Sequence, residues 1–421
     1  MTSIRGALTT RGSAFIAAGL TLLVGGLLLG FTDITRVGVL LCSLPVLAGL
    51  NARRNSNSVV LTRTVKPTRL VVDQTAGVAV MLKNISGRRT QLQLAEEHVD
   101  NLLGHRPRFI MPAMEPGDIR EMNYQIRSQV RGRYQLGPLT LRRQDPYGLA
   151  SITATQPGTT DILVLPRIEI LGRGRPRTND VGAEGAIPHL VALHGEDDVA
   201  VRSYHDGDDL RRIHWPTTAH RSELMVRQED PPARRRAVIV LDSRAAGHQG
   251  SGSMGSFEWA VTAAASIAAH LAEHRYILHL ASSETAGEGH TTQPIEVDDV
   301  LASLAMAQLG PGQQFDDVLR WAHPLTSTGG LVIAVVTDQD EAALRLTAAL
   351  RQPEGIGLLI LLDSASFAQS RPGATSDHTL ALADMVAAAG WSTCVVSLGM
   401  TVAQAWNVIS ARGADMVATG R

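Results

Sequence analysis

The chain has 421 residues, which is too long for one ordinary hydrophobic core and indicates two or three domains. Its formal net charge is −1, so no overall field attracts it to nucleic acid or to acidic membranes. The two cysteines, Cys42 and Cys394, cannot form a disulfide framework, which fits a reducing compartment.

The first fifty residues predict a membrane hairpin. Residues 12–32 carry no charge and are long enough to cross a bilayer as a helix. A second apolar run, residues 37–50, contains Pro45 and is expected to return the chain across the bilayer. A secretory signal is the competing interpretation, but no Ala-x-Ala cleavage motif follows. We therefore predict a transmembrane helical hairpin over residues 1–52.

The charges that flank the hairpin predict its orientation. Basic residues lie on both outer sides, whereas the turn predicted between the two runs carries Asp33 and Arg36. These flanking residues are Arg5, Arg11, Arg53, Arg54, Arg63 and Lys66. By the positive-inside rule both ends face the cytoplasm. We expect a multi-pass protein of the inner or plasma membrane with cytoplasmic soluble domains.

Residues 58–170 predict a β-sandwich-like domain. Short runs with alternating or β-branched side chains, such as residues 77–84 and 133–143, are separated by turns rich in Gly, Pro, Asn and Asp. Regular short strands of this kind are typical of a sandwich. The next tract, residues 172–196, is Gly-rich and without a clear period, so we expect a long loop.

Residues 171–232 contain this loop and a charged segment, residues 201–230. Asp208 is placed to cap a short helix that Pro216 ends, and residues 223–230 alternate as in a strand. The mixed charge of the segment disfavours nucleic-acid binding.

Three interpretations of the charged segment remain. Asp208 with His214 or His205 would form a general acid–base pair, although no nucleophile elbow, HExxH motif or P-loop accompanies them. Arg-mediated contact with an anion or a peptide is a second possibility; its residues are Arg211, Arg212 and Arg227. The third is a structural joint between two domains, in which Trp215 is buried and Asp208 pairs with an arginine.

Residues 233–421 alternate fully apolar runs with helical periodicity. This pattern predicts a doubly wound α/β domain with helices on both faces of a parallel sheet. In such folds ligands bind beyond the carboxyl ends of the strands, where Asp242 and Asp338 are expected.

Two runs of this domain, AVIVLDSRAAG and VIAVVTDQD, resemble the first and fourth strands of von Willebrand factor A domains. That family holds a divalent cation through Asp-x-Ser-x-Ser, a Thr and a further Asp. Here Arg244 and Ala246 occupy the serine positions. The resemblance therefore implies a degenerate site without metal at Asp242 and Asp338, which would cap helices or pair with Arg244.

Two motifs resemble the "domain of unknown function 58" family. Residues 131–150, RGRYQLGPLTLRRQDPYGLA, are similar to its RGRYxLGPLxLxxxDPFGL run. The second motif, Y-x-x-GD-x-x-R-x-I-x-W-x-x-x-A, is matched by Tyr204, Gly207, Asp208, Arg211 or Arg212, Ile213, His214, Trp215 and Ala219. One departure is His220, where an Arg commonly follows the Ala; Arg221 is the nearest substitute.

The resemblance covers nearly the whole chain and implies two membrane helices, a β domain and a degenerate von Willebrand A-like domain, without established catalysis and without a cofactor. Genes of the family commonly neighbour MoxR-type AAA+ ATPases, which implies such an ATPase and its client proteins as partners. We expect a non-enzymatic, membrane-anchored scaffold or adaptor in chaperone-like complex assembly, whose rim around Asp242 and Asp338 docks the partner. The alternative is an envelope-associated hydrolase that uses Asp208 and His214.

Overall fold

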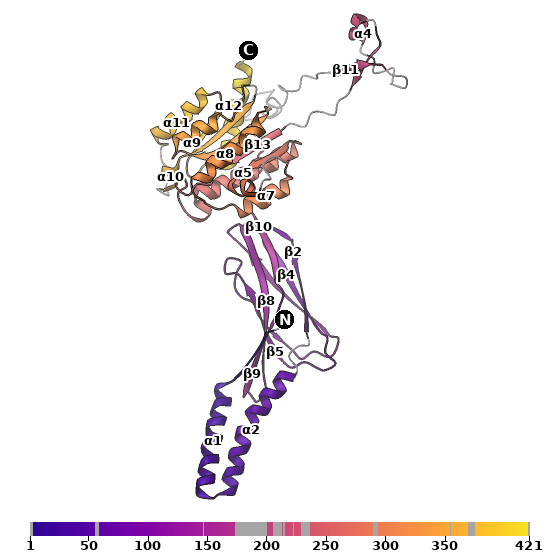
Figure 1. Ribbon diagram of the computed structural model, residues 1–421, viewed down its shortest axis with the longest axis vertical. Coiled ribbons are helices and arrows are strands. Elements are labelled where there is room, and N and C mark those ends of the chain that lie inside the picture. Colours follow the sequence, from indigo (N-terminus) through magenta and orange to yellow (C-terminus); the bar gives the residue numbers. More distant parts are fainter. Residues whose placement is uncertain are drawn as a thin grey trace, which may run out of the picture. The chain divides into compact units, whose positions relative to one another are not determined.

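The computed structural model describes residues 3–54, 59–145, 147–172, 200–204, 213, 215–221, 223–228, 236–288, 294–327, 329–353, 355–368 and 375–419. The chain divides into two compact units, Met1–Leu165 and Pro166–Arg421. Figure 1 shows the helices and strands of both units.

The first unit begins with a strand and a pair of apolar helices. Helices α1 (Thr10–Leu29) and α2 (Thr32–Arg54) are both long and apolar enough to cross a membrane. Gly30, in the left-handed region at φ 74°, ends α1, and α2 starts two residues later. The predicted turn around Asp33 and Arg36 is therefore wrong, because both residues lie at the start of α2, where they pair at 3.1 Å.

Small residues allow α1 and α2 to approach closely. Gly12, Gly19 and Gly26 recur every seven residues and are the buried residues of α1. A Cβ at Gly19 would lie 2.6 Å from Cys42 Sγ, and a Cβ at Gly26 would lie 2.6 Å from Thr35 Oγ1. Close contact at small residues is how helices commonly associate in lipid, where hydrophobic burial gives little driving force.

Two sheets form the β part of this unit. The smaller one has the order β2 (Val59–Lys66), β4 (Thr75–Asn84), β7 (Ile119–Arg127). The larger one has the order β1 (Ser3–Leu8), β9 (Ala150–Gln156), β8 (Gly132–Gln144), β10 (Thr160–Leu165), β3 (Arg69–Val71), and β5 (Gln93–Val99) joins β8 to β6 (Arg108–Met111). Buried side chains of both sheets, such as Val80 and Leu139, share one cluster, as in a sandwich.

Strand β1 lies before the helices in the chain but belongs to the larger sheet. It pairs antiparallel with β9, from Ser3 opposite Thr155 to Leu8 opposite Ala150. Strand β2 follows α2 and lies in the smaller sheet of the same unit. The segments on both sides of the helix pair are therefore held in one folded unit.

The second unit contains a parallel sheet. Its order is β14 (Ile277–Ala281), β13 (Arg236–Leu241), β15 (Leu331–Thr337), β16 (Ile356–Leu362), β17 (Ser392–Val396), and every neighbouring pair is parallel. The helices are α5 (Ser256–Glu273), α6 (Ser283–Glu288), α7 (Val297–Met306), α8 (Gln313–Thr326), α9 (Glu341–Ala348), α10 (Ser364–Ala368), α11 (Asp377–Ala388) and α12 (Val402–Thr419). This is the mixed α/β architecture that the alternating pattern predicts.

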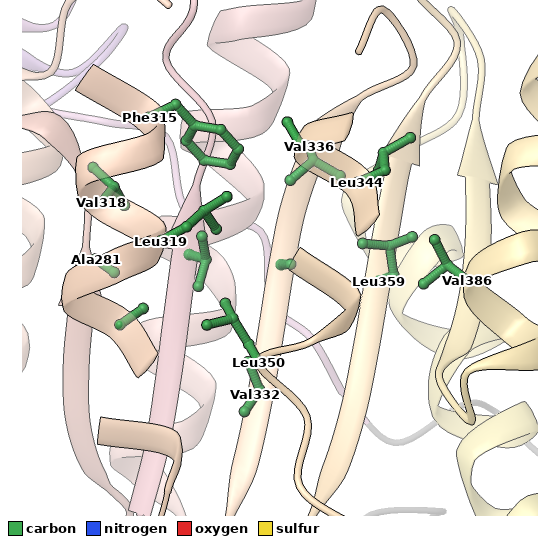
Figure 2. Close-up of a cluster of buried hydrophobic side chains, with 14 of the residues drawn as sticks. Ala281, Phe315, Val318, Leu319, Val332, Val336, Leu344, Leu350, Leu359 and Val386 are labelled. Atoms are coloured by element: carbon green, nitrogen blue, oxygen red, sulfur yellow. The ribbon is translucent and has the colours of Figure 1, made fainter. Parts of the chain in front are cut away.

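Helices cover both faces of this sheet. Figure 2 shows one core, in which Phe315 and Leu319 of α8 and Leu344 of α9 pack on side chains such as Val332 and Leu359 of the strands. Helices α5 and α12 contact the sheet through side chains outside this cluster. Side chains on both faces of the strands are thus buried, which explains why the strands are apolar throughout rather than alternating.

A small module precedes the parallel sheet in the chain. Strands β11 (Ala200–Ser203) and β12 (Met225–Gln228) pair antiparallel, and α4 (Trp215–Arg221) lies between them in the chain. The strand expected within residues 223–230 is present as β12. The prediction that Pro216 ends a helix is wrong: Pro216 is the second residue of α4, a position that tolerates proline because its missing N–H has no helical partner. The predicted loop over residues 172–196 lies, beyond residue 172, outside the described residues.

Candidate functional site

The carboxyl ends of β13 and β15 form the first candidate site. From β13 the chain continues to β14 on one side of it and then to β15 on the other side. Ligands of open α/β sheets bind at such a reversal of strand order. Asp242 follows β13 there, and Asp338 and Asp340 follow β15.

The side chain of Arg244 occupies this position. Its Nε and Nη2 donate to the carboxylate of Asp242 at 2.9 and 2.7 Å, and its Nη1 donates to Asp340 at 2.6 Å. The guanidinium carbon lies 4.6 Å from the ring centroid of Phe315, and the side chain is only 8 % exposed. Arg244 is therefore an internal cation held by two carboxylates and an aromatic ring.

The positive charge of Arg244 is compensated by carboxylates of the same cluster. Burial by itself would lower the pKa of Arg244, but the hydrogen bonds and charge of Asp242, helped by Asp340, raise it above its ordinary value. Asp242 is fully buried and also accepts from the hydroxyl of Thr337 at 3.1 Å. The predicted pairing of Asp242 with Arg244 is thus present. Among the described residues, no group of three His, Cys, Asp or Glu side chains is placed to hold a metal ion.

Asp338 belongs to a different network from Asp242. Its carboxylate accepts from the hydroxyl of Thr379 in α11 at 2.6 Å and from the backbone N–H of Ser364 at 3.3 Å. Asp242 and Asp338 are 0 % and 3 % exposed, so neither side chain can contact a partner directly. Docking of a partner at the rim around these two buried carboxylates stays a prediction.

The sequence analysis missed Asp340, which connects the cluster to a helix. Its Oδ1 accepts from the backbone N–H groups of Ala342 and Ala343 as the N-cap of α9, while Oδ2 binds Arg244. The position of Asp340 directly before a helical pattern is a capping signal that sequence reasoning could have used.

Most of the first family motif, residues 131–150, builds strand β8. Tyr134 donates its hydroxyl to the carbonyl of Val130 at 2.8 Å, which fixes the start of the strand. Gly137 has φ 92°, and a Cβ there would lie 2.6 Å from the carbonyl oxygen of Gly158 and 2.7 Å from Nη2 of Arg63. These motif residues shape the backbone and the packing of the β unit.

The second family motif forms the small module. Tyr204 donates its N–H to the carbonyl of Leu224 at 2.8 Å, and Ile213 forms a β-bridge with Val226. Trp215 begins α4 and is 66 % exposed. Trp215 is therefore not buried within the module itself, and the predicted structural joint between two domains stays a prediction.

Several predicted residues of this motif lie outside the described residues: Gly207, Asp208, Arg211, Arg212 and His214. The proposed acid–base pair of Asp208 and His214 is among them and stays a prediction. Arg227 lies in β12.

One family model matches the part of the chain that includes the small module and the start of the parallel sheet. The family described as "Protein of unknown function DUF58" matches residues 200–293, from β11 to beyond α6, and confirms the resemblance to that family. The "Uncharacterized protein YeaD" of Bacillus subtilis (strain 168) is 26% identical over 122 residues, which cover 29% of this chain and 30% of that protein. The chain thus matches less than a third of the length of this relative.

Solved structures give weak similarity. A CARDB domain from Pyrococcus furiosus is 15% identical with a TM-score of 0.19, over 26% of this chain and 90% of that domain. The C-terminal domain of wzt is 10% identical with a TM-score of 0.21, over 29% of this chain and 83% of that domain.

Proposed function

We propose that the chain is a non-enzymatic, membrane-anchored scaffold or adaptor that binds protein partners through the module β11–α4–β12. The observation that carries this proposal is the exposure of Trp215, 66 %, at the start of α4. Leu224 of the same module is 44 % exposed. Trp is enriched among the residues that dominate binding energy at protein interfaces, because it buries a large area and loses little conformational entropy.

The arrangement around the helix pair supports anchoring with the folded units on one side of the membrane. Strand β1 precedes α1 and strand β2 follows α2, and both lie in the same folded unit. An even number of spans satisfies this constraint, because the chain must return to the side from which it entered. The basic residues that flank the pair favour the cytoplasm as that side, by the positive-inside rule.

The side chain of Arg244 at the carboxyl ends of β13 and β15 supports a binding role over a catalytic one. The position at which this fold class binds ligands is filled by the side chain of Arg244, itself paired with Asp242 and Asp340. We further propose that the second unit is a degenerate von Willebrand A-like domain. Asp242 and Asp338 would stand at ligand positions of that family, and Arg244 would supply the positive charge beside Asp242.

A MoxR-type AAA+ ATPase is the proposed partner, with client proteins delivered for complex assembly. To test this, the full chain in nanodiscs is titrated with a purified MoxR-type AAA+ ATPase. Trp215→Ala should weaken binding by at least about tenfold, because the loss of a central aromatic contact costs about 2 kcal/mol or more.

The matched control for this titration is Trp321→Ala in α8, where the native side chain is 39 % exposed. It should leave the affinity unchanged. Equal affinities of the wild-type chain and Trp215→Ala would refute the role of the module. Turnover of a small molecule by the purified chain would refute the non-enzymatic assignment.

A further inference from the structure

We propose that the turn formed by residues 147–149, between β8 and β9, is a second contact with the bilayer, in which Tyr147 lies among the lipid headgroups. This inference rests on the membrane anchor of the proposed function. The helix pair would bring this surface of the β unit to the lipid, and Tyr147 would hold the surface there.

The turn has a fixed shape. The buried carboxylate of Asp145 accepts from the backbone N–H of Tyr147 at 3.0 Å and of Ala150 at 2.6 Å. The carbonyl of Asp145 accepts from the N–H of Gly148 at 2.9 Å. The carboxylate therefore holds the turn closed from inside and leaves the side chain of Tyr147 on the outside, 76 % exposed.

The same turn is attached to the first turn of α1. Thr9, the N-cap of α1, donates its N–H to the carbonyl of Leu149 at 3.1 Å and its hydroxyl to the carbonyl of Gly148. A Cβ at Gly12 would lie 2.0 Å from the carbonyl oxygen of Leu149, so only glycine allows this approach. Helix and turn are therefore in direct backbone contact.

This attachment sets the depth of Tyr147. The uncharged part of α1 starts at Gly12, its third residue, so the turn touches the helix within about 5 Å of the start of the apolar span. Tyrosine favours this boundary, because its ring is apolar and its hydroxyl remains hydrated. Arg11 is exposed in the same region, with Nη1 3.8 Å from the Cβ position of Gly148, and can pair with lipid phosphate.

The test measures the depth of position 147 in a bilayer. Tyr147→Cys in the full chain is labelled with bimane and reconstituted into phosphatidylcholine vesicles that contain a headgroup-spin-labelled phosphatidylcholine. The wild-type chain, treated in the same way, gives the background from Cys42 and Cys394. We expect loss of bimane fluorescence at position 147.

The matched control is Leu102→Cys, whose native side chain is 53 % exposed in the loop after β5. Val99 at the end of β5 pairs with Leu136, which lies eight residues before Gln144 in β8. That is about 27 Å along the strand at about 3.4 Å per residue. A label at position 102 should keep its fluorescence.

Flotation of the vesicles separates the possible outcomes. Chains that float with the vesicles but show equal fluorescence at positions 147 and 102 overturn the interfacial contact and leave the anchor intact. Chains that do not float overturn both. Quenching at position 147 alone supports the proposal.

Discussion

Replacement of Arg244 by methionine tests whether this side chain holds the carboxyl ends of β13 and β15 together. Methionine keeps a flexible side chain beside Phe315 but removes the hydrogen bonds to Asp242 at 2.9 and 2.7 Å. Removing one partner of a buried ion pair costs about 3–5 kcal/mol, because the other charge stays buried without compensation. The half-exposed partner Asp340 adds less than about 1 kcal/mol. Arg244→Met should therefore lower the free energy of unfolding of the second unit by about 3–5 kcal/mol.

Urea unfolding of the full chain in nanodiscs, followed by tryptophan fluorescence, measures this loss. All five tryptophans of the chain lie between positions 215 and 406, so the signal reports the second unit. Adding Asp242→Asn to Arg244→Met should recover part of the loss, because the uncompensated charge disappears. Asp340→Asn is the control and should change stability by less than about 1 kcal/mol. An Arg244→Met chain within 1 kcal/mol of the wild type would refute the argument that buried charge dominates this site.

Two further predictions concern the helix pair and pH. Gly19→Leu should separate α1 from α2 at a cost of about 1–3 kcal/mol, and should therefore speed alkylation of Cys42 in detergent. Gly25→Leu is the control and should not change the alkylation rate, because nothing lies within 4 Å of its Cβ position. Equal alkylation rates in the two variants would contradict the packing of α2 against Gly19. Burial lowers the pKa of His248, so the unfolded chain takes up more protons and the second unit should lose stability as pH falls below about 6.5. Urea unfolding midpoints at pH 7.5 and 5.5 measure this loss of stability. His248→Gln should reduce the difference between the two midpoints, whereas His220→Gln, at an exposed position, should leave it unchanged. An unchanged difference in His248→Gln would rule out His248 as its source.

The sequence predicts best where burial leaves a simple pattern. The parallel strands β13 and β15 are apolar throughout because both faces are covered, and their last residues place Asp242 at the sheet edge without any coordinates. The helix pair can also be predicted from the sequence, because an uncharged run of about twenty residues is the length of a membrane-spanning helix. The pairing of Asp242 with Arg244 is one of the two alternatives that the sequence leaves open, and the structure shows it.

What the sequence does not predict depends on contacts between distant segments. Helix α8 has a clear helical period, but nothing in that period shows that Phe315 lies against Arg244, which comes from the loop after β13. Strand β9 contains β-branched residues such as Ile152 and Thr155, which favour a strand, but its pairing with β1 across both helices leaves no local signal. The exposure of Trp215 could not be predicted from the sequence either, because an aromatic residue in a charged segment is compatible with both a buried core and a binding surface.

The pairing of β1 with β9 has a consequence for the order of synthesis. Ser3 is translated before both apolar helices, whereas its neighbour Thr155 emerges only after the helices and most of the sandwich. During that interval the first strand has no neighbour to bond with, and the growing sheet has an open flank. The bonds between β1 and β9 can therefore form only after both helices have been synthesised.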